Sequence, residues 1–250
     1  MSPAAQGPAD LILGLDDTDM PDTPGTNRLA RALSGRLPEF GYRVLVVLRH
    51  QLFFDDAVPY TSKNGSASIL CRQLDAEPRP DALFEAFAAA TREFAPEGAD
   101  PALALARPEP LTDGIRDFAQ RARRELVTPA EAASLAAEAG IRLETLAGRE
   151  HGQVGALAAV ALAAGGQDGR VIHASGWPWP DHLAGVLEPS QLAARGIAEL
   201  REPATDRALE LQPVRVRKRL RPAWRDHRIV LYVEAATGDG GAVRRALKRS

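Results

Sequence analysis

A short apolar stretch that stops at a group of acids most constrains how this chain can fold. Residues 11–15 are apolar apart from Gly14, and the run is long enough for one buried β-strand. Four aspartates follow within seven residues, and prolines and Gly25 then break regular structure until a helical pattern begins at Asn27. The sequence therefore predicts a strand, an acidic loop at its carboxyl end, and a helix.

Apolar runs of strand length alternate with helical patterns over most of the chain. We expect further strands at residues 42–48, 67–71, 141–146, 171–174, 209–216 and 229–234. We expect helices at residues 27–37, 81–94 (with Asp81 as cap), 112–126, 129–140 and 156–164. This alternation predicts an α/β or intermixed α+β fold. The expected body is compact and two-lobed, with residues 1–10 as a disordered lead, 11–175 as the main lobe and 176–250 as a second, smaller α+β lobe.

Composition narrows the class of protein. The 250 residues are 45% apolar and 26% charged, which is ordinary for a globular protein with a sizeable core. No apolar run approaches the roughly 20 residues of a membrane span, and the N-terminus lacks the pattern of a secretory signal. A single cysteine, Cys71, excludes an internal disulfide and a thiolate zinc cluster. We expect a soluble, cytoplasmic protein with no membrane partner, and the oligomeric state is left open.

The acidic loop is a candidate metal site. Asp16, Asp17 and Asp19 lie so close in sequence that they repel one another, which raises the pKa of at least one carboxyl group unless a cation intervenes. Ligands that are all oxygen suit Mg²⁺ better than zinc. An acidic turn, with the aspartates accepting hydrogen bonds from nearby amides, is an equally good interpretation of the spacing alone.

Thr26 allows two interpretations of the helix that follows the loop. Threonine is a favoured N-cap residue, and this is the more common role at such a position. The same place suits phosphate chemistry, because the free amides of a helix N-terminus attract anions. A hydroxyl group there, a few residues from a metal loop, can accept or position a phosphoryl group.

Two further loops contain residues suited to anion binding. Residues 58–66 are polar and include Lys63 and the turn-forming pair Asn64 and Gly65, so they predict either a hairpin or an anion cradle. Residues 148–155 bear glycines between a predicted strand and a predicted helix. The latter loop matches neither a Walker A motif nor a dinucleotide fingerprint.

Three of these segments, in this order, resemble motifs of one family, the archaeal agmatinylcytidine synthetases that modify the anticodon of an isoleucine tRNA. Residues 14–19 with Gly25-Thr26 look like the opening motif, and residues 58–60 with the loop at Lys63 look like the second. Residues 152–159 look like the third, and the helix expected before them also fits. The resemblance covers roughly residues 11–162.

The resemblance implies a function and a set of site residues. The catalytic domain of that family binds ATP and Mg²⁺, splits ATP to AMP and pyrophosphate, and phosphorylates both a threonine of its own and the target cytosine. By position, Asp16, Asp17 and Asp19 would hold Mg²⁺ and take part in catalysis, and Thr26 would be the phosphorylated threonine. The residues implied in nucleotide binding are Thr18, Lys63, Asn64, Gly65, Arg149, Gly152 and Gly155.

The chain also departs from the family. Its second motif has Thr61-Ser62 where the archaeal enzymes carry Lys-Thr, so the positive charge stands at Lys63 instead. The oligonucleotide-binding fold and the cysteine-rich zinc ribbon that hold the tRNA are expected to be missing. We therefore expect an ATP- and Mg²⁺-dependent enzyme of AMP-forming synthetase or kinase type that activates a small molecule by phosphoryl transfer, with tRNA as a less favoured partner.

A basic segment near the C-terminus leaves alternatives open. Residues 214–228 contain seven Lys or Arg residues against one acid, Asp226. They can contact an RNA backbone or form a solvated strand edge that discourages aggregation, the interpretation preferred here. The alternatives to a small-molecule enzyme are a nucleotide- or RNA-binding module that has lost catalysis and a tRNA-modifying homologue acting with a partner. The histidines show no metal-ligand spacing.

Overall fold

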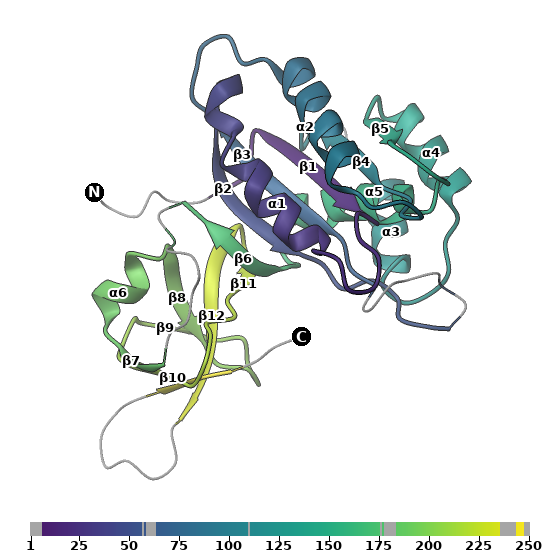
Figure 1. The fold of residues 1–250 in the computed structure, drawn as a ribbon. Coiled ribbons are helices and arrows are strands. Elements are labelled where there is room, and N and C mark those ends of the chain that lie inside the picture. Colours follow the sequence, from purple (N-terminus) through teal and green to yellow (C-terminus); the bar gives the residue numbers. More distant parts are fainter. Residues whose placement is uncertain are drawn as a thin grey trace.

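A computed structural model describes residues 7–56, 58, 64–109, 111–175, 177, 184–235 and 244–247. The first part of the chain forms the strands β1 (Leu11–Asp16), β2 (Tyr42–Arg49), β3 (Ala67–Gln73), β4 (Ala102–Ala106), β5 (Arg142–Thr145) and β6 (Arg170–Ala174). Its helices are α1 (Thr26–Ser34), the 3₁₀ helix η1 (Leu37–Phe40), α2 (Pro80–Phe94), α3 (Asp113–Arg121), α4 (Pro129–Glu138) and α5 (Gly152–Ala164). The predicted mixture of helices and strands is confirmed (Figure 1).

The last part of the chain is mostly β-structure. It contains β7 (Gly185–Leu187), α6 (Pro189–Ala193), β8 (Ile197–Arg201), β9 (Ala208–Leu209), β10 (Val214–Val216), β11 (Ala223–Arg225), β12 (Arg228–Ala235) and β13 (Arg244–Ala246). These elements lie together beyond β6 in Figure 1. The strand expected at 209–216 is wrong as one element, because β9 pairs with β8 while β10 pairs with β7 and β13.

The sheet of the first part is antiparallel at every described pairing. Its order is β5-β4-β1-β3-β2-β6, and β6 continues to β11 and β12. The end of β1 therefore lies beside the beginnings of β3 and β4, and the end of β2 lies beside the beginning of β6. In parallel sheets, ligands bind at the edge where the strands end. That rule does not locate the site in this antiparallel sheet, because some strands begin and others end at the same edge.

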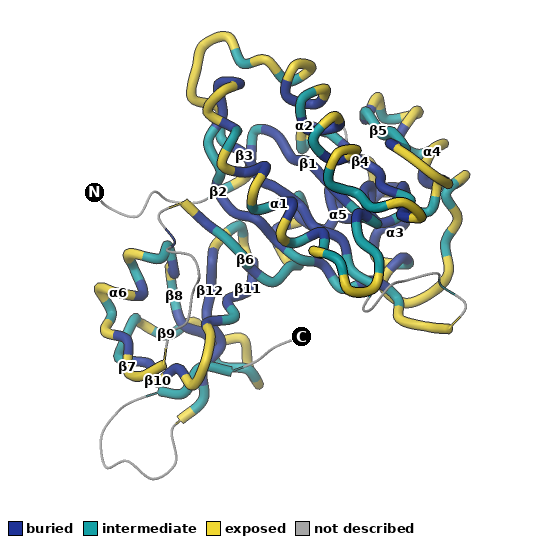
Figure 2. The backbone as a smooth tube through the Cα atoms, viewed as in Figure 1, coloured by how far each residue is buried: buried dark blue, intermediate teal, exposed yellow. Residues whose placement is uncertain are grey.

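Helices cover both faces of β1. Leu11, Leu13 and Leu15 pack in one apolar cluster with α1 and α2, whereas Ile12 packs in the other with α3, α4 and α5. This alternation follows from the two-residue period of a strand. Figure 2 shows the consequence, with β1 buried along its length beneath helices whose outer sides are exposed. The acidic loop thus leaves a strand that is held on both sides.

The glycines of β1 and α5 allow a close approach of the two elements. A Cβ atom at Gly14 would lie 2.0 Å from the carbonyl oxygen of Ala156, and one at Gly155 would lie 1.8 Å from Oδ2 of Asp16. The expectation that residues 148–155 form a loop with a helix from 156 is wrong for its second half, because α5 already begins at Gly152. The first turns of α5 are thereby fixed against Asp16.

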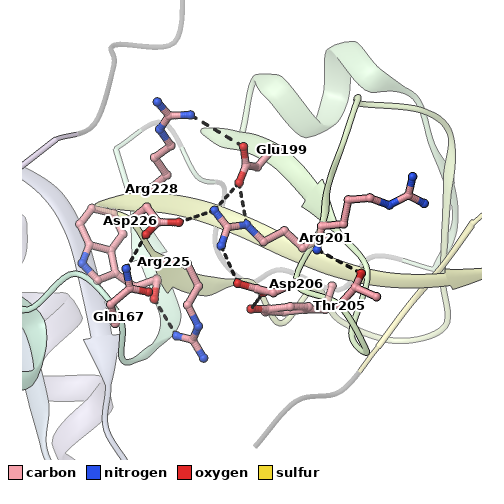
Figure 3. A network of polar contacts seen from close by, with 11 residues as sticks. Gln167, Glu199, Arg201, Thr205, Asp206, Arg225, Asp226 and Arg228 are labelled. Carbon is pink, nitrogen blue, oxygen red and sulfur yellow. Dashed lines mark hydrogen bonds and ion pairs between the residues drawn. The ribbon is translucent and has the colours of Figure 1, made fainter.

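The two parts of the chain join through the end of α5. The indole nitrogen of Trp224 on β11 donates a hydrogen bond to the carbonyl of Ala163 at 3.3 Å. Arg201 is buried among Glu199, Asp206 and Asp226, and Asp226 also accepts a hydrogen bond from Gln167 after α5 (Figure 3). Since strand pairing continues from β6 to β11, the expected boundary near residue 175 stays a prediction.

Some predictions about helix ends are confirmed and one is wrong. Thr112 and Thr128 cap α3 and α4, and each hydroxyl accepts a hydrogen bond from the amide three residues further on. Asp81 is not the cap of α2, which begins at Pro80 after Arg79. The strand β4 was not expected, because its alternation of alanine and leucine is a weak strand signal. None of the helices in the described ranges has the length and apolar character needed to cross a bilayer.

Candidate functional site

A cavity of about 640 Å³ opens at the edge of the sheet where β1 ends. This size is within the range of small-molecule sites in proteins. One wall is acidic and another is basic. The cavity is lined by residues Asp16, Asp17, Asp19, Gly25, Thr26, Asn27, Arg49, Gln51, Leu52, Phe53, Val58, Asn64, Gly65, Ala122, Arg123, Glu125, Leu126, Val127, Pro129, His151, Val154, Asp168, Gly169, Arg170, Arg221, Pro222, Ala223 and Arg225.

The structure brings most of the predicted site residues to this cavity. Those that line it are Asp16, Asp17, Asp19, Thr26, Asn64 and Gly65. Thr18 is fully buried behind the wall. Gly152 and Gly155 lie in α5 but do not line the cavity, and Arg149 lies on the loop before α5, where its backbone amide donates to Asp100 at 2.6 Å. Lys63, Tyr60, Thr61 and Ser62 lie outside the described residues.

Thr26 is not the N-cap of α1. Gly25 occupies that position without a side-chain cap, and Thr26 is the first helical residue. The Thr26 hydroxyl is nearly buried, accepts a hydrogen bond from the Thr18 hydroxyl at 3.0 Å, and donates one to Oδ1 of Asp19 at 3.2 Å. A carboxylate that accepts a hydrogen bond from a hydroxyl group can take up its proton. It thereby increases the nucleophilicity of the hydroxyl oxygen.

The acidic wall is electrostatically strained. Burial, with a further contribution from Asp17, raises the pKa of Asp16 to about 8. Burial, with contributions from Asp100 and Asp19, raises the pKa of Asp17 to about 6. Asp17 also has a left-handed backbone, with φ of 53°, which aspartate tolerates better than most residues. A cation on this wall would relieve the repulsion.

The carboxylates of the acidic wall fit a metal ion that is shared with a nucleotide better than one held by protein side chains alone. Within the residues that the structure describes, no three His, Cys, Asp or Glu side chains are grouped so as to hold a metal ion by themselves. Magnesium commonly uses one or two carboxylates and takes its remaining ligands from water and from substrate phosphates. The acidic wall suits such a nucleotide-borne Mg²⁺ and does not suit a structural metal cage.

The basic wall was not predicted as a unit. Arg49 ends β2 and Arg170 begins β6, and the two residues are directly paired across the antiparallel strands. Arg221 and Arg225 reach the same cavity from the basic segment noted in the sequence. A Cβ atom at Gly65 would lie 2.6 Å from Nη2 of Arg49. Gly65 therefore leaves room for this guanidinium group, a role that no local motif signals.

Two histidine networks flank the cavity. Nδ1 of His151 lies 2.9 Å from Oδ2 of Asp100, and His151 lines the cavity at the start of α5. His50 is fully buried, with Nδ1 2.8 Å from Oδ1 of Asp168 and Nε2 2.9 Å from the Ser68 hydroxyl. Asp168 in turn pairs with Arg123 on the cavity wall at 3.2 Å. Sequence spacing could not reveal either network, because each joins distant segments.

Sequence comparison alone places the chain in no family: no family model and no curated protein matches it. Its fold, however, is similar to part of a class of enzymes of known structure that act on tRNA. The solved enzyme to which it is similar is TiaS, a tRNA agmatidine synthetase. TiaS in complex with its isoleucine tRNA and ATP has a TM-score of 0.52 at 24% identity, over 60% of this chain and 36% of that chain.

Two further solved structures are similar to the same share of this chain. Apo TiaS has a TM-score of 0.50 at 24% identity, over 60% of this chain and 35% of that chain. A tRNA fluorescent labelling enzyme has a TM-score of 0.51 at 25% identity, again over 60% and 35%. The chain thus matches about a third of the length of these proteins. The resemblance noted in the motifs is confirmed at the level of the fold.

Proposed function

We propose that this protein is an ATP-dependent enzyme that transfers phosphoryl groups, with Thr26 as its first acceptor. The observation that carries the proposal is the hydrogen bond from the Thr26 hydroxyl to Asp19 in a cavity with one acidic and one basic wall. The shared fold supports it, because TiaS is known in a complex with ATP and tRNA. Phosphoryl transfer depends mainly on positioning and on charge stabilisation, and both are available here.

The step at Thr26 balances with the groups present in the cavity and ATP. The Thr26 oxygen attacks the terminal phosphorus of ATP, and its proton passes to Asp19. A new phosphorus–oxygen bond forms at Thr26 while the bond to the bridging oxygen breaks, so that ADP leaves in this step, whereas the family resemblance implies AMP and pyrophosphate as products. Thr18 donates to the same oxygen and orients its remaining lone pair. The phosphothreonine would then sit at the start of α1, where the helix amides favour an anion.

One or two of the carboxylates of Asp16, Asp17 and Asp19 would hold a Mg²⁺ ion, with the phosphates as its other ligands, and this ion would neutralise charge that develops during transfer. Asn64 and Gly65 lie on the rim and are proposed nucleotide contacts, as are Lys63 and Arg149. Gly152 and Gly155 would act indirectly, by letting the first turns of α5 approach Asp16.

Phosphorylation of Thr26 is directly testable. We expect incubation with Mg²⁺ and γ-labelled ATP to add one phosphate to the intact mass, and Thr26→Ala to abolish this addition while Thr26→Ser keeps part of it. Thr23→Ala is the matched control, since Thr23 lies in the same loop and bonds only to Met20 in the described contacts. Peptide mapping by mass spectrometry gives the site. A labelled Thr26→Ala protein would show that the acceptor lies elsewhere.

The final acceptor is proposed to be RNA. The preference for a small molecule stated from the sequence has no support in the comparisons, since a solved neighbour is complexed with tRNA. A second hollow of about 530 Å³ adjoins the cavity through Arg221 and is lined by Arg217, Lys218, Arg219, Arg221, Arg245, Ala246 and Leu247. Such a basic surface fits a phosphate backbone better than a neutral metabolite.

Binding measured at several salt concentrations distinguishes the acceptors. RNA binding through phosphates weakens steeply and linearly on a logarithmic scale as salt rises, and substitution of Arg217 or Lys218 should reduce that slope. A protein that binds no RNA at low salt yet turns over ATP with a small amine or alcohol would restore the small-molecule interpretation. A protein that binds ATP and never forms ADP or AMP would be a binding module.

A further inference from the structure

Three arginines on the basic wall share one small region of the sheet edge. Arg49 and Arg170 are opposite partners across β2 and β6, so their side chains leave the sheet on the same face. The carbonyl of Pro222 accepts a hydrogen bond from Val171 at 2.9 Å, which places Arg221 beside the beginning of β6. All three line the cavity and are only partly exposed. The fold therefore concentrates positive charge at one point.

No salt bridge neutralises this charge in the described part of the protein, although Arg49 donates a hydrogen bond to Oε1 of Gln51 at 2.9 Å. No ion pair joins Arg49, Arg170 or Arg221 to a carboxylate among the residues that the structure describes. Burial lowers the pKa of Arg49, and the charge of Asp16 offsets this only in part. Burial, together with Arg49, Arg221 and other arginines, lowers the pKa of Arg170 to about 10. Like charges placed directly opposite each other destabilise a strand pair, so the arrangement calls for an anion.

Two strands separate most of this charge from the acidic wall. Asp16 ends β1, and the strand order places β3 and β2 between β1 and β6. With neighbouring strands about 4.8 Å apart, the backbones of β1 and β6 are about 14 Å apart at this edge. Arg49 lies between the two ends, whereas Arg170 and Arg221 lie at the β6 end. Nucleotide phosphates that share a metal with the acidic wall are held at the β1 end, so a different anionic group can occupy the other.

We infer that Arg49, Arg170 and Arg221 form a second phosphate site, which binds a phosphate group carried by the acceptor and not one of the nucleotide phosphates. That the acceptor carries this phosphate rests on the proposed function, whereas the anion site itself does not depend on catalysis. Arginine suits this role because its planar fork donates two parallel hydrogen bonds to phosphate oxygens. The site would hold the acceptor across the cavity from the Thr26 hydroxyl.

The first test uses the full chain without nucleotide or Mg²⁺. Calorimetric titration with inorganic phosphate in HEPES and EDTA should show one saturable site. We expect Arg170→Gln to weaken binding at least about tenfold, and Arg221→Gln to do the same from a different segment. Arg36→Gln is the matched control, because Arg36 follows the far end of α1 and pairs with Glu39. Unchanged phosphate binding in Arg170→Gln and Arg221→Gln would overturn the site.

The melting temperature, measured with and without phosphate, distinguishes a phosphate-binding arginine from one that only supports the fold. Arg170→Gln removes one of two opposed charges, so its melting temperature without phosphate should equal or exceed that of the wild type, while the increase caused by phosphate should be lost. If Arg170 serves only to hold the fold together, the same substitution lowers the melting temperature and leaves the increase intact. That result counts against the inference.

The second test separates acceptor phosphate from nucleotide phosphate. Phosphate is titrated into protein saturated with Mg²⁺ and a non-hydrolysable ATP analogue. Retained phosphate binding supports a separate site, and complete displacement would assign the arginines to the nucleotide. Competition by a short RNA, but not by a nucleoside monophosphate, identifies a phosphodiester as the source, and the reverse identifies a phosphomonoester. None of these outcomes requires turnover, so loss of ATPase activity would contradict only the proposed function.

Discussion

The interactions of single side chains decide the chemistry at the acidic loop. Asp19 and Thr18 bracket the Thr26 hydroxyl, one as acceptor and one as donor. The motif predicted these residues because they are close in sequence, so local order was sufficient. It could not predict that Thr26 lies inside α1 and leaves the cap to Gly25, since the cap depends on the backbone geometry of the loop.

Asp19→Asn should slow phosphorylation of Thr26 by roughly a hundredfold or more, because an amide cannot accept the hydroxyl proton as a base does. Folding stability should change little, since the amide oxygen can still accept the hydrogen bond. Initial rates of label incorporation measure the effect. Asp22→Asn, in the exposed part of the same loop, is the control and should keep the wild-type rate. Equal rates for all three proteins would remove Asp19 as the base.

The raised pKa of Asp16 makes the folding stability of the protein decrease as the pH rises. The folded protein binds this proton more tightly than the unfolded chain, so the contribution is fully present below pH about 4 and is lost as the pH rises through about 8. Asp16→Asn should therefore stabilise the metal-free protein increasingly between these values. Urea unfolding in EDTA from pH 5 to 9 measures the difference, and Mg²⁺ with nucleotide should shrink it at high pH. Parallel pH curves would contradict the raised pKa of Asp16.

At the level of elements, the close packing of α5 against β1 positions the whole acidic wall. The sequence indicated β1 through a short apolar run and most of α5 through a run of small residues, and it indicated most other strands and helices through apolar runs or periodicity. It did not indicate their pairing, because register across a sheet is set by contacts between distant segments. The basic wall shows this clearly, since Arg49 and Arg170 meet only when β2 pairs with β6. A strand order that starts β5-β4-β1-β3 cannot be read from periodicity.

Gly14→Ala should destabilise the protein by about 3 kcal/mol or more, because the new Cβ atom meets the backbone of α5 and neither element can yield cheaply. Chemical denaturation measures the loss, and nucleotide affinity should fall with it as α5 moves from Asp16. Gly165→Ala at the end of the same helix is the control. Its φ of −65° and contacts no closer than 3.6 Å predict a change within about 1 kcal/mol. Similar losses of stability in both variants would argue against close packing between β1 and α5 at Gly14.

For the molecule as a whole, Arg201 and its three acids link β8, the β8–β9 connection and the turn before β12 (Figure 3). Arg201→Met should cost about 2 kcal/mol or more, because the acids lose their common partner, though two of them are half exposed and are partly screened by water. Urea unfolding followed by tryptophan fluorescence, to which buried Trp224 contributes, measures it. Arg207→Met, at an exposed arginine 3.7 Å from Glu202, should be near neutral. A neutral Arg201→Met would mean that the network is replaceable by apolar packing.

The junction at the end of α5 also has a consequence for the growing chain. The Asp226-His227 turn has left-handed backbone at both residues, and a Cβ atom at Gly166 would lie 2.6 Å from the His227 ring. During synthesis the ribosome releases α5 and Gly166 well before the hairpin that covers them. Until then the Ala163 carbonyl lacks the indole partner that it has in the finished fold. Nascent chains stalled at a length that has released α5 from the ribosome, but not yet β11 and β12, should therefore engage chaperones, and their release should follow completion of β12.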